Sequence, residues 1–266
     1  MTVCSKNFTE SVLLGEIVAQ QLERHEIRVR RKLNLGGTFV CHEALVAGEV
    51  DTYVEYTGTA HSAILGLPTE RDAEVVYRLV DSAYGARWDL EWTEPLGFDN
   101  TFAMLVRGET ARQHGLETLS DAVPHAGSWR PGFGYEFMER ADGYRGLVET
   151  YSLVFRTRPA VMDLGLTYRA LADGQVDIIA GNSTDGQIAA LGLVHLADDR
   201  RYFPPYEAAP VVRRDAFERF AGLRDALAAL GGTIDEAAMQ RMNFLVDVER
   251  RDVRNVAAEF VAGLRG

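Results

Sequence analysis

The sequence predicts an α/β protein with two similar lobes, each built on a mostly parallel sheet flanked by helices. The main observation is a unit that occurs twice: residues 44–60 read ALVAGEVDTYVEYTGTA, and residues 170–186 read ALADGQVDIIAGNSTDG. Each copy has an apolar helical stretch that ends at a glycine, then a strand, then small hydroxyl residues suited to beginning a helix. Helix, strand and helix joined by short turns are typical of parallel sheets. The long interval between the copies indicates one copy in each lobe.

The first predicted element is a strand at residues 2–4, followed by a helix whose apolar face includes residues 12–22. Asn7 and Glu10, three residues apart, predict a capping box at the start of this helix. Lys6 then lies just before a helix N-terminus, where backbone amides and the helix dipole favour an anion. We expect Lys6 to meet a ligand carboxylate there, and a solvated surface lysine is the alternative.

The two copies also place comparable residues at the carboxyl ends of their strands. The predicted strands cover residues 50–56 and 176–181, so Tyr56 and Asn182 come at or just after these ends. Ligands of open α/β sheets bind beyond the carboxyl ends of the strands. We therefore expect both residues to line one cleft from opposite lobes, with an aromatic ring on one side and an amide on the other.

Two extended stretches, residues 98–107 and 208–213, predict crossovers between the lobes, because each follows a turn that contains proline. This assigns residues 1–102 and 205–266 to the first lobe and residues 103–204 to the second. Two crossovers are the hinge arrangement of a receptor that closes around its ligand.

Bulk composition argues against several classes of function. The formal net charge of −11 would repel phosphate backbones, so no nucleic-acid partner is expected. No apolar run approaches the ~20 residues that cross a bilayer. The strand expected at the N-terminus leaves no room for a signal peptide. That fits a cytoplasmic protein, a mature exported form or a domain of a longer chain.

No motif for catalysis, a metal or a cofactor emerges. His42 and Glu43 lack the second histidine of a zinc-protease helix, and no dinucleotide or P-loop motif is present. Cys4 and Cys41, the only cysteines, are interpreted as small buried hydrophobic residues, with a disulfide between them as the alternative. We therefore predict no enzyme, no metal and no cofactor.

Eight segments along nearly the whole chain match the motifs of one known family. They are SKNFTES at 5–11, LNLGGT at 33–38, ALVAGEVDTYVEYTGTA at 44–60, PLGFDNTFAM at 95–104, EFMERADG at 136–143, DLGLTYRALADGQVD at 163–177, STDGQI at 183–188 and FPPYEAAPVVR at 203–213. With them the sequence resembles the substrate-binding components of osmoprotectant ABC transporters, which capture glycine betaine, choline, carnitine and related solutes. The resemblance implies a two-lobed periplasmic-binding-protein fold of type II with two hinge crossovers.

The resemblance also implies a pocket with two parts. An aromatic box holds the quaternary ammonium group by cation–π attraction, and a polar clamp holds the carboxylate or hydroxyl of the ligand. Carried over position by position, the box comprises Tyr56, Phe102, Asn182 and Tyr206, and the clamp comprises Lys6, Thr59 and Arg140. Asn100 is also expected to face the cleft.

Each assignment has a structural alternative: a core ring or hinge packing for the three aromatic residues, a helix cap for Asn182, and pairing with Glu136 or Glu139 for Arg140. The family commonly has tyrosine where this chain has Phe102 and Asn182. Loss of one aromatic wall would weaken betaine binding about ten- to thirtyfold. The other hypothesis is that the amide serves a different ligand, one with a polar ring or an additional hydroxyl.

The function implied by the resemblance is that of a receptor that delivers a small, zwitterionic quaternary ammonium solute to an ABC permease with its ATPase. Its place would be the periplasmic or extracellular side of a membrane. Glycine betaine, choline, carnitine, proline betaine and ergothioneine all stay open as ligands. The alternatives are a cytoplasmic ligand-sensing domain on the same fold, a binder of a non-quaternary solute, and an enzyme built on this fold.

Overall fold

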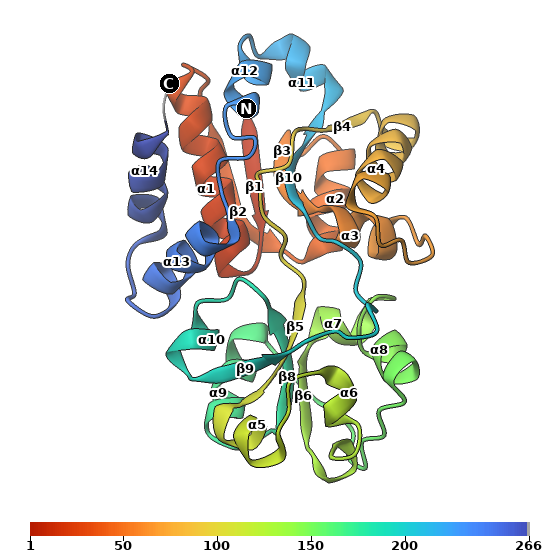
Figure 1. Ribbon diagram of the computed structural model, residues 1–266. Coiled ribbons are helices and arrows are strands. Elements are labelled where there is room, and N and C mark those ends of the chain that lie inside the picture. The colour runs from red at the N-terminus through yellow and green to blue at the C-terminus, as the bar shows by residue number, and fades with distance from the viewer. Residues whose placement is uncertain (265–266) are drawn as a thin grey trace.

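The computed structural model describes residues 1–264 and contains two five-stranded sheets, which lie one above the other in Figure 1. We call the part built on the first sheet lobe I and the part built on the second sheet lobe II. Within the described residues, no helix has the length and apolar character needed to cross a membrane.

The first sheet has the strand order β2-β1-β3-β10-β4. Its strands are β1 (Thr2–Lys6), β2 (Arg30–Gly36), β3 (Thr52–Tyr56), β4 (Leu90–Trp92) and β10 (Ala208–Arg213). Strands β2, β1 and β3 are parallel, and β10 is antiparallel to both β3 and β4. Four strands therefore run in one direction, and β10 alone runs against them.

The second sheet repeats this plan with the order β7-β6-β8-β5-β9. Its strands are β5 (Phe102–Arg107), β6 (Pro131–Gly134), β7 (Ala160–Met162), β8 (Ile178–Asn182) and β9 (Leu193–Leu196). Here β5 is the strand that runs against the other four. The prediction of two mostly parallel sheets is confirmed.

The reversed strands β5 and β10 are the two stretches predicted as crossovers. Each begins where the chain arrives from the other lobe, so its first residue pairs with the last residue of a parallel strand: Ala208 with Tyr56, and Phe102 with Asn182. The segments before them run side by side between the lobes in Figure 1, and a bridge between Asp99 and Glu207 joins them. The lobe boundaries at residues 102/103 and 204/205 stay a prediction.

Helices cover both faces of each sheet. In lobe I they are α1 (Thr9–Arg24), α2 (Thr38–Val46), α3 (Thr57–Thr59), the π-helical turn η1 (Ala60–Ile64), α4 (Ala73–Trp88), α11 (Arg214–Arg219), α12 (Leu223–Ala228), α13 (Glu236–Asp247) and α14 (Val253–Gly263). In lobe II they are α5 (Gly108–His114), α6 (Leu119–Ala122), the 3₁₀ turn η2 (Ala126–Ser128), α7 (Tyr135–Glu139), α8 (Tyr144–Tyr151), α9 (Leu164–Ala172) and α10 (Gln187–Ala190).

The buried residues of β1 and β3 alternate between the two faces of the first sheet, as side chains along a strand must. Val3 and Val54 join the core that α1 covers, whereas Cys4 and Tyr53 join the core under α2 and α4. Cys4 and Cys41 are both fully buried and free. Their interpretation as small buried hydrophobic residues is confirmed, and the alternative of a disulfide is wrong.

The repeated unit folds the same way twice. Helices α2 and α9 both lead into a glycine with positive φ, 75° at Gly48 and 68° at Gly174, a backbone conformation that glycine adopts without a steric penalty. The same hydrogen bonds close both turns, from Gly48 to Leu45 and from Gly174 to Leu171. The strands start two residues later than predicted, at Thr52 and Ile178, because the residues before them complete the turn.

The predicted capping box is wrong. Helix α1 begins at Thr9, with Phe8 at the N-cap and no side-chain cap. Glu10 does not turn back to the helix start, because its carboxylate is buried at the junction between the lobes and bonds there to residues from distant parts of the chain.

Candidate functional site

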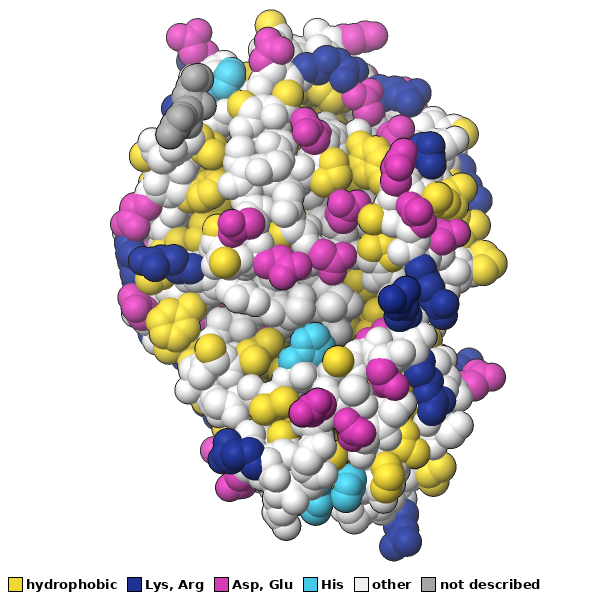
Figure 2. All heavy atoms as spheres, in the orientation of Figure 1, with side chains coloured by type: hydrophobic (Ala, Val, Ile, Leu, Met, Phe, Trp, Pro, Cys, Tyr) yellow, Lys and Arg dark blue, Asp and Glu magenta, His cyan; other side chains and the backbone are white. Residues whose placement is uncertain are grey.

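The predicted site residues lie where the carboxyl ends of β3 and β8 face each other across the junction between the lobes. Six of them are less than 9% exposed: Lys6, Tyr56, Thr59, Asn100, Arg140 and Tyr206. Phe102 and Asn182 are half-buried. On the face shown in Figure 2, atoms of the two lobes meet across the junction, which ends in a notch at the right edge of the view. Most of the predicted site residues are therefore shielded from solvent.

Arg140 and two predicted box residues form one cluster. The Arg140 guanidinium carbon lies 4.9 Å from the Phe102 ring centroid and 5.9 Å from that of Tyr206. Asp142 holds the guanidinium with two hydrogen bonds, to Nε at 2.8 Å and to Nη2 at 2.6 Å. The Tyr206 hydroxyl donates to the same carboxylate at 2.6 Å. Arg140 thus pairs with Asp142, which was not among the predicted site residues, and the alternative pairing with Glu136 or Glu139 is wrong.

Lys6 and Tyr56 form a second cluster. The Lys6 ammonium lies 4.5 Å from the Tyr56 ring centroid and 5.5 Å from that of Phe8. Its ion pair is with Glu55, 2.6 Å away and fully buried. Lys6 is only 3% exposed, so the alternative of a solvated surface lysine is wrong. A buried ammonium needs such a partner, because an unpaired charge away from water is strongly unfavourable.

Glu10 connects the lobes beside this second cluster. One carboxylate oxygen accepts from the Tyr56 hydroxyl at 2.6 Å and from Asn100 Nδ2 at 2.7 Å. The other accepts from Thr184 Oγ1 of lobe II and from Asn243 Nδ2 of α13, the latter at 2.8 Å. Burial raises the pKa of Glu10, and these four hydrogen bonds oppose that shift. The four donors come from four separate segments, so Glu10 links parts of the chain that are distant in the sequence.

Asn182 lies directly opposite Phe102 on the neighbouring strand, so both side chains are on the same face of the second sheet. Its side-chain amide and its backbone amide both bond to Asp185, at 3.3 Å and 3.0 Å. Asp185 is also the acceptor of the Tyr168 hydroxyl. The structure thus brings the amide of Asn182 close to the aromatic ring predicted as its partner in the box.

Thr59 lies in α3, beside the one glycine that lets Tyr206 approach lobe I. A Cβ atom at Gly58 would lie 2.6 Å from the Pro205 carbonyl oxygen and 2.7 Å from the Tyr206 ring, both closer than real contacts allow. Tyr206 therefore contacts α3 on one side and the Arg140 cluster on the other. Its ring bridges the lobes.

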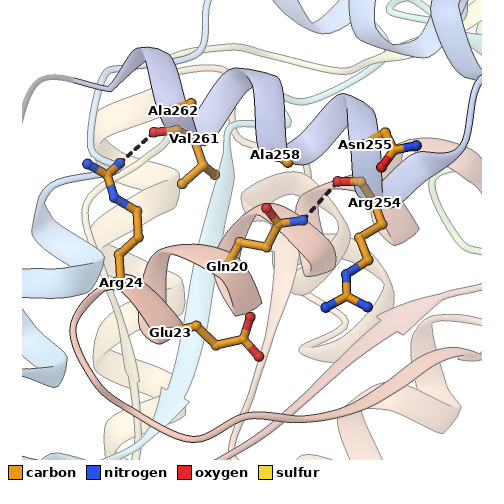
Figure 3. A pocket seen from close by; sticks show the side chains of 8 residues that line it. All are labelled: Gln20, Glu23, Arg24, Arg254, Asn255, Ala258, Val261 and Ala262. Carbon is orange, nitrogen blue, oxygen red and sulfur yellow. Dashed lines mark hydrogen bonds between the residues drawn. The ribbon is translucent and has the colours of Figure 1, made fainter.

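Figure 3 shows a surface groove between α1 and α14, far from this junction in the fold. Two hydrogen bonds cross it: Gln20 Nε2 donates to the Arg254 carbonyl at 2.9 Å, and Arg24 Nη1 donates to the Val261 carbonyl at 2.5 Å. They fasten α14 to α1. No predicted site residue lines the groove.

The family of the chain follows from comparison with known proteins. A family model described as the substrate-binding domain of an ABC-type glycine betaine transport system matches residues 1–263. The chain belongs to this family. The resemblance found from its motifs is confirmed, and so is the two-lobed type II periplasmic-binding-protein fold.

Three relatives show the range of this family. The glycine-betaine-binding protein of Pseudomonas aeruginosa is 34% identical over 277 residues, covering 98% of this chain and 86% of that one. The carnitine transport binding protein OpuCC of Listeria monocytogenes is 33% identical over 256 residues, covering 95% and 83%. The ergothioneine transport permease/ergothioneine binding protein EgtU of Helicobacter pylori is 32% identical over 265 residues. That match covers 99% of this chain, which spans only 47% of that relative.

Solved structures agree. The crystal structure of a glycine betaine/carnitine/choline ABC transporter has a TM-score of 0.82 and 31% identity, covering 98% of this chain and 97% of that one. Lactococcal OpuAC, closed around glycine betaine, shares the fold with a TM-score of 0.68 at 12% identity, covering 98% and 95%. The members of this family are transport binding proteins.

Proposed function

We propose that this chain is the solute-binding receptor of an ABC importer and captures a small quaternary ammonium solute between its lobes. The observation that carries the proposal is the pairing of aromatic faces with cations at the junction. Lys6 lies over Tyr56, and Arg140 lies over Phe102 and Tyr206, at 4.5 to 5.9 Å from the ring centroids. These are distances at which a ring attracts a cation.

In the proposed complex the ammonium group of the solute takes a place over these rings. Lys6 and Arg140 keep donors beyond those used by Glu55 and Asp142, because an ammonium has three N–H groups and a guanidinium has five. Those donors, with the Thr59 hydroxyl, would meet the carboxylate or hydroxyl of the solute. Asn100 and Asn182 would complete the polar part of the site.

Closure around the solute would use the two crossovers as hinges, between lobe I at residues 1–102 and 205–266 and lobe II at residues 103–204. A ligand that touches both lobes favours the closed state by the difference between its affinities for the closed and open states. The relatives named above support delivery to an ABC permease with its ATPase as the next step, at the periplasmic or extracellular side of a membrane. No chemical change of the solute is part of the proposal.

Calorimetric titration of the purified chain with glycine betaine, choline, carnitine, proline betaine and ergothioneine tests the proposal. At one hundred times its dissociation constant, a ligand stabilises the folded state by about 2.7 kcal/mol, so a thermal-shift screen with the same solutes gives a second readout. Tyr56→Ala and Tyr206→Ala should each weaken binding at least tenfold. Tyr77→Ala is the control, because the Tyr77 hydroxyl bonds to carbonyls of Trp92 and Thr93 away from the junction. Absence of binding by all five solutes would refute the quaternary ammonium assignment.

A further inference from the structure

Both tyrosines that face a cation at the junction give their hydroxyl hydrogen to a buried carboxylate. Tyr56 donates to Glu10 and Tyr206 donates to Asp142, each at 2.6 Å. Glu10 is 1% exposed and Asp142 is 6% exposed. Each ring therefore has a cation on its face and an anionic acceptor at its edge.

The two carboxylates differ in how their charge is balanced. Asp142 forms a two-point ion pair with Arg140. The partners of Glu10 within residues 1–264 are two amides and two hydroxyls, and none is basic. A carboxylate with four donors has all its acceptor positions used in the ionised form. In its ionised form, Glu10 is thus stabilised by hydrogen bonds and neutralised by no cation among these partners.

An anion in this position strengthens the attraction of the Tyr56 ring for a cation. A phenol that donates to a carboxylate is polarised toward its oxygen, which makes the ring face more negative. The carboxylate charge itself also acts on a cation over the ring, and away from water that attraction is only weakly screened. The Lys6 ammonium, which is paired with Glu55, already lies over this ring, 4.5 Å from its centroid.

We propose that Glu10 is a specificity-determining residue of the solute site, which acts through the Tyr56 hydroxyl to favour a permanent positive charge over an uncharged group of the same shape. This inference rests on the proposed function, because it concerns the same site. Glu10 would act as a positioning residue, since its carboxylate accepts the Tyr56 hydroxyl and would act on the solute through that ring.

The test compares each quaternary ammonium solute with an isostere in which an uncharged carbon replaces the positively charged nitrogen and the rest of the molecule is the same. The pairs are choline with 3,3-dimethylbutan-1-ol and glycine betaine with 3,3-dimethylbutanoate. Calorimetry gives the ratio of the two dissociation constants for each protein. This ratio isolates the effect of the positive charge, because the change in shape is the same for every variant.

Glu10→Gln should reduce the preference for the cation about tenfold while the affinity for the isostere changes less than threefold. Tyr56→Phe, which keeps Glu10 but removes the hydroxyl, should reduce the preference in the same direction and serves if Glu10→Gln does not fold. Asp198→Asn is the matched control. Asp198 also accepts a tyrosine hydroxyl, from Tyr151, and the Arg200 guanidinium carbon lies 5.0 Å from that ring centroid, but none of these three is a predicted site residue. The control should leave the ratio unchanged.

An equal loss of affinity for cation and isostere in Glu10→Gln would overturn the inference, because it would reduce Glu10 to a structural tie between the lobes. An unchanged ratio in both Glu10→Gln and Tyr56→Phe would overturn it as well. Failure of the unmodified chain to bind any quaternary ammonium solute would refute the proposed function first, and with it this inference. The two failures are therefore distinguishable from the unmodified protein alone.

Discussion

The carboxylate of Glu136 accepts the backbone amide hydrogen of Thr38, with 2.7 Å between Oε1 and N. Thr38 is the first residue of α2 on lobe I, and Glu136 lies in the first turn of α7 on lobe II. The amides at a helix N-terminus lack partners within the helix and favour a negative charge. This contact therefore joins the two lobes, and in the proposed closure of the lobes it would contribute to the free energy of the closed state.

Glu136→Ala should open the lobes and weaken solute binding about five- to thirtyfold, since the lost contact is worth about 1 to 2 kcal/mol. Gly37→Ala should have a similar effect, because a Cβ atom there would lie 2.3 Å from Glu136 Oε1 and would displace the carboxylate. Gly37 has φ −74° and ψ −173°, which alanine also adopts, so backbone strain does not complicate this variant. Calorimetry and the radius of gyration in solution measure both effects.

The control is Gly165→Ala, where a Cβ atom would meet nothing within 4 Å. It should leave affinity and radius of gyration unchanged. Normal binding by both Gly37→Ala and Glu136→Ala would contradict a role for this contact in closure.

Lys6→Met should destabilise the folded chain by about 3 to 5 kcal/mol, because it leaves the fully buried Glu55 carboxylate without its cation. Adding Glu55→Gln removes that charge and should restore part of the lost stability. Chemical denaturation of the two single variants and the double variant measures the coupling. If Lys6→Met is as stable as the unmodified chain, the ion pair does not contribute the expected 3 to 5 kcal/mol, about the cost of leaving a buried charge unpaired, to the free energy of unfolding.

Asp185 should make stability depend on pH. Burial raises the pKa of its carboxyl from 3.8 to about 7 in the folded state, against the effect of hydrogen bonds from Tyr168 and from the Asn182 backbone. The folded chain then binds the proton more tightly than the unfolded chain, so this contribution is fully present below pH 3.8 and is lost as the pH rises through 7. Above that range its effect levels off.

The check is the free energy of unfolding of the unmodified chain and of Asp185→Asn at several pH values between 4 and 8. The difference between the two proteins should change in favour of Asp185→Asn as the pH rises from 4 to about 7 and then level off. A constant difference would show that Asp185 titrates near its ordinary pKa in the folded chain.

Asn182→Tyr should tighten the binding of quaternary ammonium solutes about tenfold, because it adds a ring opposite Phe102 on the same face of the sheet. Asn182→Leu, which adds apolar volume without a ring, is the control and should give no comparable gain for the cation. Weaker binding by Asn182→Tyr would favour the other hypothesis, in which the amide itself bonds to the ligand. Calorimetry with choline and glycine betaine distinguishes the two.

Much of the fold could be predicted because its signals are local. These signals extend over only a few residues: the glycines at 48 and 174, the hydroxyl residues after each strand and the alternation of apolar residues. The repeated unit contains each of them twice. The capping box failed because its signal was also local, whereas the position of Glu10 is decided by distant partners. A spacing of three residues indicates that a cap is possible, but it does not determine where a carboxylate bonds in the folded chain.

For the site as well, residues in local motifs could be predicted, whereas their partners from distant segments could not. Tyr56, Phe102, Arg140 and Tyr206 were selected by motif, and the structure brings the last three into one cluster. Their carboxylate partners could not be predicted, because most acidic residues are exposed to solvent. The residues next to them in the sequence do not indicate that these carboxylates are buried.

By itself, the sequence determined that this chain has two α/β lobes of the same plan, with aromatic and basic residues at the strand ends where the lobes meet. Only the tertiary structure decided which charges are neutralised: Lys6 by Glu55, Arg140 by Asp142, and Glu10 by no cation among its partners. The physical reason is that secondary structure depends on contacts a few residues apart. The pairing of buried charges depends on which distant segments exclude water from the same place.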